Sequence, residues 1–418
     1  MMSGAKKRVP KRRFKEFLSA GDWKQRKLSD ISTKVTTKNV DVHYTETLTN
    51  SAEQGIISQV DFFEKEISNK NNINGYYIVE NNDFIYNPRI STLAPVGPIN
   101  RNKLNRTGIM SPLYTVFRAS NIDLDFLEWY FQSNHWYRYM KLNGDSGARA
   151  DRIAIKDSTF FDMPIKTPVN IKEQVLIGET LEKFNQYITL HQRKLDKLQA
   201  TKKALLQEMF PEEGQDKPKR RFKGFTDAWE QRKLNDFVII RRGLTYKPSD
   251  IAENGIRVLR SSNIDEDQFI TSNDDVFVNK DAVNIPFAKN GDILITSANG
   301  SNRLVGKHTI ISDIAENSTV HGGFMLLAES KNPLFTDALL SSNWYKRFIN
   351  TYVAGGNGAI GNLSKSDLEN QTVVVPSEHE QAKIGQWYDN INQLITLHQR
   401  KLDKLKNLKQ AYLNEMFV

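Results

Sequence analysis

The stretch that most constrains this chain occurs twice. Residues 188–198 read ITLHQRKLDKL, and residues 395–405 repeat those letters 207 positions later (395 − 188). A repeat period of half the 418-residue chain indicates that one large unit has been duplicated, in contrast to an array of small repeats. The copies lie in longer helical patterns, so the duplication includes extended helices.

The same opening phrases precede both halves. KRRFKEF at 11–17 matches KRRFKGF at 219–225, and WKQRKL at 23–28 matches WEQRKL at 229–234. Most of the sequence between the opening and closing phrases differs, which indicates a repeated frame around two unlike globular middles. The predicted limits are a basic N-terminal segment 1–22, a first domain 23–168, a first repeated helix 169–210, a linker and repeat start 211–228, a second domain 229–376 and a second repeated helix 377–418.

The two repeated helices have the spacing of a coiled coil. Residues at intervals of four and three form a heptad seam over 177–209 and again over 384–416. Each seam covers 33 residues, about 50 Å of helix. Because the seams match and a short linker joins the two units, we expect the helices to pair antiparallel within the chain. The predicted seam residues are Ile177, Leu181, Phe184, Ile188, His191, Leu195 and Leu198 in the first helix, and Ile384, Tyr388, Ile391, Ile395, His398, Leu402 and Leu405 in the second.

The middles combine short strand and helix patterns. The predicted fold class is α+β, with two α/β domains separated by two long antiparallel coiled-coil helices in a pseudo-two-fold internal repeat. The expected helices are 121–140 and 339–348; the expected strands are 83–86, 113–117 and one ending at Pro168 in the first middle, and 255–260, 292–296, 308–312, 323–328 and 372–375 in the second.

Composition narrows the class of partner. A formal net charge of +9 favours a polyanion, most often nucleic acid. The chain has no cysteine, which excludes disulfides and thiolate metal sites and fits a reducing cytoplasm. No apolar run reaches the length of a membrane span, and no apolar segment follows the basic N-terminus as in a secretory signal. We therefore expect a cytoplasmic protein without a membrane partner.

The motifs that suggest chemistry each have a simpler interpretation. His191 and His398 lie on the helix seam, where a polar residue usually fixes the register, and no further metal ligands share their face. Residues 356–361 fit GxGxxG but are soon followed by a strand, and in GSNRLVGK (300–307) the phosphate-loop spacing fails. Residues 329–331 form an isolated E-x-K, and NPRI at 87–90 lacks the residues of an amino-methyltransferase motif.

The lack of a catalytic constellation predicts recognition without chemistry and no metal site. Loops rich in Asn, Arg, Ser and Gly supply donors for base edges and let the backbone approach phosphates. A plain surface loop is the alternative interpretation of each such residue. The candidate DNA contacts are Arg149, Arg152, Asn299, Ser301, Asn302, Arg303, Lys307 and Asn357.

The doubled frame resembles the specificity (S) subunit of type I restriction-modification enzymes. The resemblance rests on FKxF, WxQRKL, the EQxxIG phrases beginning at Glu173 and Glu380, and ITLHQRKLDKL followed by EMF. Within the middles, residues 108–118 and 291–307 resemble recurrent target-recognition phrases. NLSKSDL at 362–368 resembles the usual closing phrase of such domains, whereas its first-half counterpart, 152–160, departs from it.

The resemblance implies a non-catalytic subunit with two target-recognition domains. Each domain would read one half of a split, asymmetric site in double-stranded DNA, and the long helices would set the unread spacer. Two methyltransferase (M) subunits would supply S-adenosylmethionine chemistry, usually adenine N6 methylation. Two restriction (R) subunits would supply cleavage with ATP and Mg. No cofactor is expected on this chain.

Two other functions are compatible with the residues. One is a coiled-coil interaction scaffold whose basic surface is incidental. The other is a self-contained methyltransferase or nuclease, which would require the isolated chain to bind S-adenosylmethionine or a metal.

Overall fold

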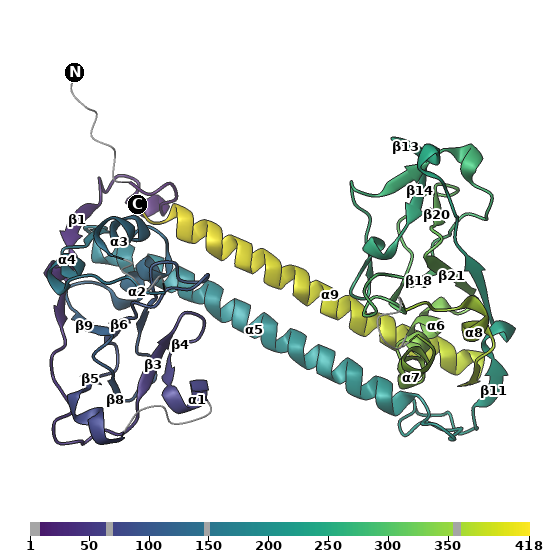
Figure 1. Ribbon diagram of the computed structural model, residues 1–418, viewed down its shortest axis with the longest axis horizontal. Helices are drawn as coiled ribbons and strands as arrows, with labels where there is room; N and C mark the ends of the chain where they lie inside the picture. Colours follow the sequence, from purple (N-terminus) through teal and green to yellow (C-terminus); the bar gives the residue numbers. More distant parts are fainter. Residues whose placement is uncertain (1–8, 64–69, 146–150, 354–360) are drawn as a thin grey trace. The chain divides into compact units, whose positions relative to one another are not determined.

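The computed structural model describes residues 9–63, 70–145, 151–353 and 361–418. Its contacts divide the chain into two units (Figure 1). Unit 1 comprises Met1–His191 and Lys401–Val418, and unit 2 comprises Gln192–Arg400. Each unit therefore combines one globular domain with parts of both long helices.

The long helices are α5 (Ile171–Met209) and α9 (Glu378–Glu415), and both begin before the predicted seams. The α5 start is set by Asn170, whose side-chain oxygen accepts from the Lys172 backbone N–H at 2.9 Å. Acidic residues in both first turns, Glu173 and Glu380 among them, suit the positive end of the helix dipole. These interactions stabilise at least one helical turn before the first seam residue of each helix.

The two helices run antiparallel within each unit (Figure 1). In unit 1 the Phe184 ring meets the Tyr412 ring at 5.0 Å between centroids, and Lys409 donates to Asn185 at 3.1 Å. In unit 2 the Lys202 ammonium lies 4.8 Å from the centre of the Tyr388 ring. The antiparallel pairing predicted from the matching seams is thus confirmed. Every predicted seam residue is buried or half-buried.

The repeated frame forms the same structure in both units. Strand β1 (Lys24–Lys27) pairs antiparallel with β10 (Pro164–Thr167), and β11 (Glu230–Lys233) pairs likewise with β22 (Thr372–Val375). An arginine of each opening phrase binds the acidic residue of the EQ pair through two hydrogen bonds: Arg13 with Glu173, and Arg221 with Glu380. The predicted internal repeat is therefore present in the fold.

The central sheets of the two domains share one topology, although their sequences differ. The strand order is β2-β9-β6-β7 in unit 1 and β12-β21-β18-β19 in unit 2. Strand β6 therefore corresponds to β18, and β9 to β21. The bounds are β2 (Ser32–Lys34), β6 (Phe84–Tyr86), β7 (Ile99–Arg101) and β9 (Thr115–Ala119), and β12 (Val238–Arg242), β18 (Ile293–Thr296), β19 (His308–Ile310) and β21 (Met325–Ser330).

Further strands build on these sheets differently in each unit. Unit 1 has the pairs β3-β4 and β5-β8, whereas unit 2 has the four-stranded sheet β13-β17-β14-β20 and the pair β15-β16. The bounds are β3 (Leu48–Ser51), β4 (Gly55–Ser58), β5 (Tyr77–Val79) and β8 (Gly108–Met110), and β13 (Ile251–Ala252), β14 (Ile256–Leu259), β15 (Ile264–Asp265), β16 (Gln268–Phe269), β17 (Val276–Val278) and β20 (Thr319–His321).

Each predicted domain helix is in fact two helices. The stretch 121–140 contains α2 (Leu124–Gln132) and the start of α3 (Tyr137–Asn143), because the Ser133 hydroxyl donates to the Tyr130 carbonyl at 2.6 Å and ends the first helix. The stretch 339–348 spans the end of α6 (Pro333–Leu340) and α7 (Asn343–Tyr352), with extended backbone at Ser342 between them. The short helices are α1 (Gln59–Phe63), α4 (Asp157–Phe161) and α8 (Lys365–Glu369).

The main core of each unit includes the end of a long helix from the other half of the chain. In unit 1, Met416 and Phe417 after α9 pack with Trp23 and Phe126. In unit 2, Met209 and Phe210 at the end of α5 pack with Trp229. The repeated Glu-Met-Phe therefore anchors each long helix in a domain.

Candidate nucleic-acid interface

Two grooves lie at the ends of the central sheets. The first-domain groove has a volume of about 370 Å³ and is lined mainly by residues 49–53, 62–63, 87–91, 113–114 and 152. The second-domain groove has a volume of about 690 Å³ and is lined by residues 244–246, 248, 251, 260–261, 298–300 and 322–325. Both contain side chains that the sequence analysis proposed as DNA contacts.

The grooves occupy equivalent positions in the shared topology. Each is bordered by the loop that follows β6 or β18 and by the residues that precede β9 or β21. The registers Tyr86↔Thr115 and Thr296↔Met325 align these borders residue by residue. One architecture therefore presents a hollow at the same place in both domains, with different side chains around it.

The loop after β18 holds most of the predicted contacts of the second domain. Asn299 anchors it: its amide donates to the Ser261 hydroxyl at 2.9 Å and its carbonyl accepts from the Ser301 backbone N–H at 2.9 Å. The Asn302 side chain accepts from the Gly361 N–H at 3.0 Å but remains exposed, as do Ser301 and Arg303. Asn299 thus orients the loop, and Ser301, Asn302 and Arg303 present their side chains to solvent.

Lys307 and Asn357 differ from that group. Lys307 is half-buried just before β19, and its carbonyl accepts from the Thr296 N–H at 2.8 Å, so its backbone closes the base of the loop. Asn357 lies outside the described residues, as does Arg149 in the first domain.

Arg152 lies beside residues 87–90, the NPRI segment that lacks the residues of an amino-methyltransferase motif. Arg152 forms an antiparallel bridge with Arg89, and the Ile153 N–H donates to the Pro88 carbonyl at 2.9 Å. Both arginines line the first-domain groove. The position of residues 87–90 could have indicated that they border a groove. They follow the predicted strand 83–86, just as the loop 297–303 follows the predicted strand 292–296.

The closing phrases of the two domains fold alike despite their different sequences. The bridge Ala298↔Asn362 in unit 2 corresponds to Arg89↔Arg152 in unit 1. Helix α8 then follows residue 362 as α4 follows residue 152. The departure of 152–160 from the usual phrase therefore changes side chains at the groove but not the path of the chain.

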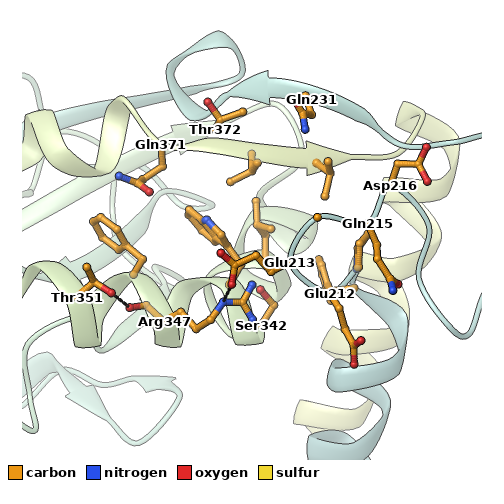
Figure 2. A pocket seen from close by; sticks show the side chains of 18 of the residues that line it. Glu212, Glu213, Gln215, Asp216, Gln231, Ser342, Arg347, Thr351, Gln371 and Thr372 are labelled. Carbon is orange, nitrogen blue, oxygen red and sulfur yellow. Dashed lines mark hydrogen bonds and ion pairs between the residues drawn. The ribbon is translucent and has the colours of Figure 1, made fainter.

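The charged residues that line these two grooves differ from those that line a third hollow. Among the described residues, the second-domain groove is lined by Arg260 and no carboxylate, and the first-domain groove by two arginines and Glu53. The third hollow, about 640 Å³ in unit 2, is lined by Glu212, Glu213 and Asp216 (Figure 2). Arg347 also lines it, and its Nε lies 3.7 Å from Glu213 Oε2. A polyanion is therefore favoured at the two grooves and repelled from the third hollow.

A buried histidine near the second-domain groove carries no charge at neutral pH. His321, which precedes the lining glycine Gly322, is buried, and this lowers the pKa of its imidazole to about 4. The ring is therefore uncharged at neutral pH, and its Nε2 lies 3.2 Å from the Arg241 carbonyl. The positive charge of the groove comes from Arg260.

Apolar side chains at the grooves were not predicted from the sequence. Phe324 is 74% exposed and Leu113 is 64% exposed, each just before a central strand. The predicted strands 323–328 and 113–117 include these two residues, but the strands begin at Met325 and Thr115. Backbone turns from Gly322 to Met325 and from Ser111 to Tyr114 delay the strand starts.

Comparison with known proteins gives a consistent set of similarities. Residues 226–407 match the family described as the type I restriction modification DNA specificity domain. The specificity subunit of the type I restriction enzyme MjaVIII from Methanocaldococcus jannaschii is 23% identical over 324 residues, covering 74% of each protein.

Solved structures share the fold. The S subunit of a type I restriction-modification system from M. genitalium covers 98% of this chain and 99% of its own, with 14% identity and a TM-score of 0.57. A chain from a study of type I system assembly and conformational transition covers 94% of this chain and 97% of its own, with 15% identity and a TM-score of 0.50. Within the described residues, no helix is long and apolar enough to cross a membrane.

Proposed function

We propose that the chain belongs to the type I restriction-modification DNA specificity family and selects the DNA sequence on which such a complex acts. The family match lies in the second half, and the first half repeats its opening and closing phrases and its central sheet. The observation that carries the proposal is the pair of equivalent, positively charged grooves whose lining residues differ between the domains.

In this proposal each domain reads one half of a split, asymmetric DNA site. Lysine and arginine side chains contact phosphates and hold the register on the duplex, whereas side chains at the grooves contact base edges. Asn302 and Arg303 serve the second domain, and Arg89 and Arg152 the first. Asn299 positions the loop that carries Asn302 and Arg303. The long helices set the unread spacer between the two half-sites.

The chain supplies recognition, and its partners supply chemistry. Two methyltransferase subunits bring S-adenosylmethionine and methylate adenine, and two restriction subunits bring ATP and Mg for cleavage. The assembly acts in the cytoplasm, where chromosomal DNA is available to it. This chain binds none of these cofactors in the proposal, so equilibrium binding of S-adenosylmethionine to the pure chain should be undetectable.

A domain exchange tests this function. Residues 29–165 are replaced by the corresponding segment of a relative, and methylated bases are mapped genome-wide in cells that also express the methyltransferase partner. We expect one half of the recognised sequence to change and the other to persist, because each domain has its own groove. The control exchange of 235–376 should change the opposite half. A change of both halves in either exchange would contradict modular reading.

The competing function, an interaction scaffold with an incidental basic surface, predicts a different result. A scaffold would give no sequence-specific binding by the chain with its methyltransferase partner. Specific DNA binding that weakens steeply with added salt would exclude it.

A further inference from the structure

Phe324 is a large apolar side chain that unit 2 exposes beside its DNA-reading loop. Its side chain is 74% exposed and borders the second-domain groove together with Tyr246, Ile251 and Met325. A single exposed apolar residue is ordinary, but one that is continuous with the apolar lining of a groove forms a patch of the kind that marks a binding site. The groove contains no carboxylate among its described lining residues, which suits contact with DNA.

The backbone of Phe324 is held in place although its side chain is free. Its carbonyl accepts from the Ser297 N–H at 2.9 Å and from the Ala298 N–H at 3.1 Å, so the residue is tied to the loop after β18. A Cβ on Gly323 would lie 3.3 Å from the Thr245 hydroxyl, and one on Gly322 would lie 3.2 Å from Val258. These close approaches fix the segment, so the ring is presented from a rigid base.

Polar groups stand at the rim of the same groove. Arg260 donates through Nη2 to the Asp274 carbonyl at 3.0 Å, which orients its guanidinium, while its buried Nε has no partner among the described residues. One amide N–H of Asn299 donates to Ser261 and its carbonyl accepts within the loop, and its second N–H has no partner among the described residues. Apolar faces with donors at the edge match the two surfaces of a nucleobase, which stacks by its face and hydrogen-bonds by its edge.

The equivalent position in unit 1 lacks this arrangement. Register places Tyr114 where Phe324 stands. The Tyr114 ring is half-buried, and its hydroxyl lies 3.3 Å from the Thr49 hydroxyl. The first-domain groove is also smaller, about 370 Å³ against about 690 Å³. The exposed rings at the first-domain groove, Phe62 and Phe63, come from α1 and not from the residue before the central strand.

We propose that the second-domain groove receives one base of its half-site, unstacked from the duplex, with Phe324 as the residue that stacks on it. Tyr246 contributes to the groove wall, and Arg260 and Asn299 face the edge of the base. The inference rests on the proposed DNA-reading function and adds a named ligand to that site. A base leaves the stack most easily at a flexible pyrimidine–purine step. The groove would therefore favour DNA sequences that deform easily at this position, in addition to those that make the right contacts.

The test uses the complex of this chain with its methyltransferase partner and duplexes carrying 2-aminopurine. The probe base replaces each position of the second half-site in turn, because its fluorescence rises when it leaves the stack. We expect a rise at one position other than the methylated base. Phe324→Ala should abolish that rise and weaken specific binding roughly 5- to 150-fold, the range of a lost base–aromatic stack. Phe324→Trp should keep the wild-type affinity, because a stacking ring remains.

Control variants distinguish failure of the base-stacking inference from failure of the proposed DNA-reading function. Tyr114→Phe, at the equivalent position of unit 1, should leave the second half-site signal unchanged. Because Phe324 is largely exposed, Phe324→Ala should keep the wild-type melting temperature. Absence of specific binding by the wild-type complex would refute the proposed function itself. Specific binding without a fluorescent position, or with a signal unchanged by Phe324→Ala, would overturn only the inference. Loss of methyltransferase binding with DNA affinity intact would identify a protein-docking surface and also overturn it.

Discussion

At the scale of residues, the ion pair in each repeated frame is the most constrained interaction. Glu173 accepts from Arg13 Nε at 2.7 Å and from Nη2 at 2.8 Å, and from Trp23 Nε1 at 3.2 Å. The Arg13 and Glu173 side chains are 3% and 1% exposed. Hydrogen bonding to Glu173 raises the pKa of Arg13, which keeps the guanidinium charged. A buried charge of this kind requires its partner.

We expect Glu173→Gln to destabilise unit 1 by about 3–5 kcal/mol, because it leaves the Arg13 charge buried without a counter-ion. Hydrogen exchange read by mass spectrometry can report each unit separately. Protection should fall in peptides covering β1 and β10 and remain in those covering β11 and β22. Equal loss in both units would contradict the assignment of this pair to unit 1.

Glu380→Gln is the matched variant in unit 2 and should be milder by about 1 kcal/mol. Arg221 is 14% exposed, so water screens it more than Arg13. Trp229 Nε1 also has no hydrogen-bond partner among the described residues, so this variant removes no such bond. A larger effect in unit 2 than in unit 1 would show that burial does not set the cost.

Residue roles were only partly predictable from the sequence. One loop does contain the four predicted contacts Asn299, Ser301, Asn302 and Arg303, as their spacing suggested. Residues within the seven-residue stretch 297–303 cannot lie far apart in space. The anchoring role of Asn299 depends on Ser261, which lies 38 positions earlier. No local pattern encodes a contact of that separation.

At the scale of elements, a polar network connects the long helices of unit 2 to its domain. The Tyr388 hydroxyl on α9 lies 2.6 Å from the Ser341 hydroxyl, which lies 3.2 Å from His308 Nε2. Asp337 on α6 lies 3.5 Å from the same nitrogen. Asp337 is largely buried, and burial raises the pKa of its carboxyl to about 6, although His308 opposes the shift. Lys202, Asp267 and Asp389 also act on this carboxyl.

This raised pKa predicts that Asp337 contributes more to the stability of unit 2 as the pH falls from 7 to 5, whereas the lowered pKa of His321 acts in the opposite direction. Between its unfolded pKa near 3.8 and its folded pKa of about 6, Asp337 binds a proton in the folded state only. Asp337→Asn should therefore stabilise the protein by up to about 3 kcal/mol at pH 7 and remove this contribution to the pH dependence. Urea unfolding at several pH values measures it.

The exposed Asp265 of the same unit supplies the control for Asp337. Asp265→Asn should leave the difference in stability between pH 5 and pH 7 as it is in the wild type. An Asp337→Asn variant that loses stability at pH 7 would show that the ionised carboxylate is needed for the network.

Element prediction succeeded where a pattern was long and failed where a side chain interrupted it. The heptad seams predicted both long helices, since the periodicity persists over more than four heptads. The shorter stretch 121–140 remains apolar and aromatic across its break, so periodicity alone gives no sign of it. The helix ends there because Ser133 caps it, and the Trp136 indole N–H then donates to the Phe131 carbonyl at 3.0 Å.

At the scale of the whole molecule, the opening phrase of each half meets the end of a long helix in the same way. In unit 2 the Arg220 N–H donates to the Glu208 carbonyl at 2.9 Å, across the linker that follows α5. In unit 1 the Arg12 N–H donates to the Glu415 carbonyl at 2.9 Å, although these residues are 403 positions apart. The side chains of each pair also form an ion pair. The contact at residues 12 and 415 thus reproduces the one made across a covalent linker.

A circular permutant should therefore fold. The permuted chain starts at Lys219, continues from Phe417 through a copy of residues 211–218 into Lys11, and ends at Phe210. We expect its melting temperature within a few degrees of the wild type and the same recognised DNA sequence, because both helix-end contacts are kept. Calorimetry and methylated-base mapping measure these. A permutant that opens the chain between Leu294 and Ile295 in β18 is the control and should fail to fold, because it cuts a buried central strand.

The duplication, the coiled-coil helices and the α+β class follow from the order of residues alone, because repeats and periodicities are properties of that order. The tertiary structure determines which side chains meet. It paired 87–90 with 152, turned Phe324 outward at a groove, and placed the end of each long helix in a core with residues distant in sequence. Such contacts depend on chain path over hundreds of residues, and different sequences can share that path, as the two central sheets do.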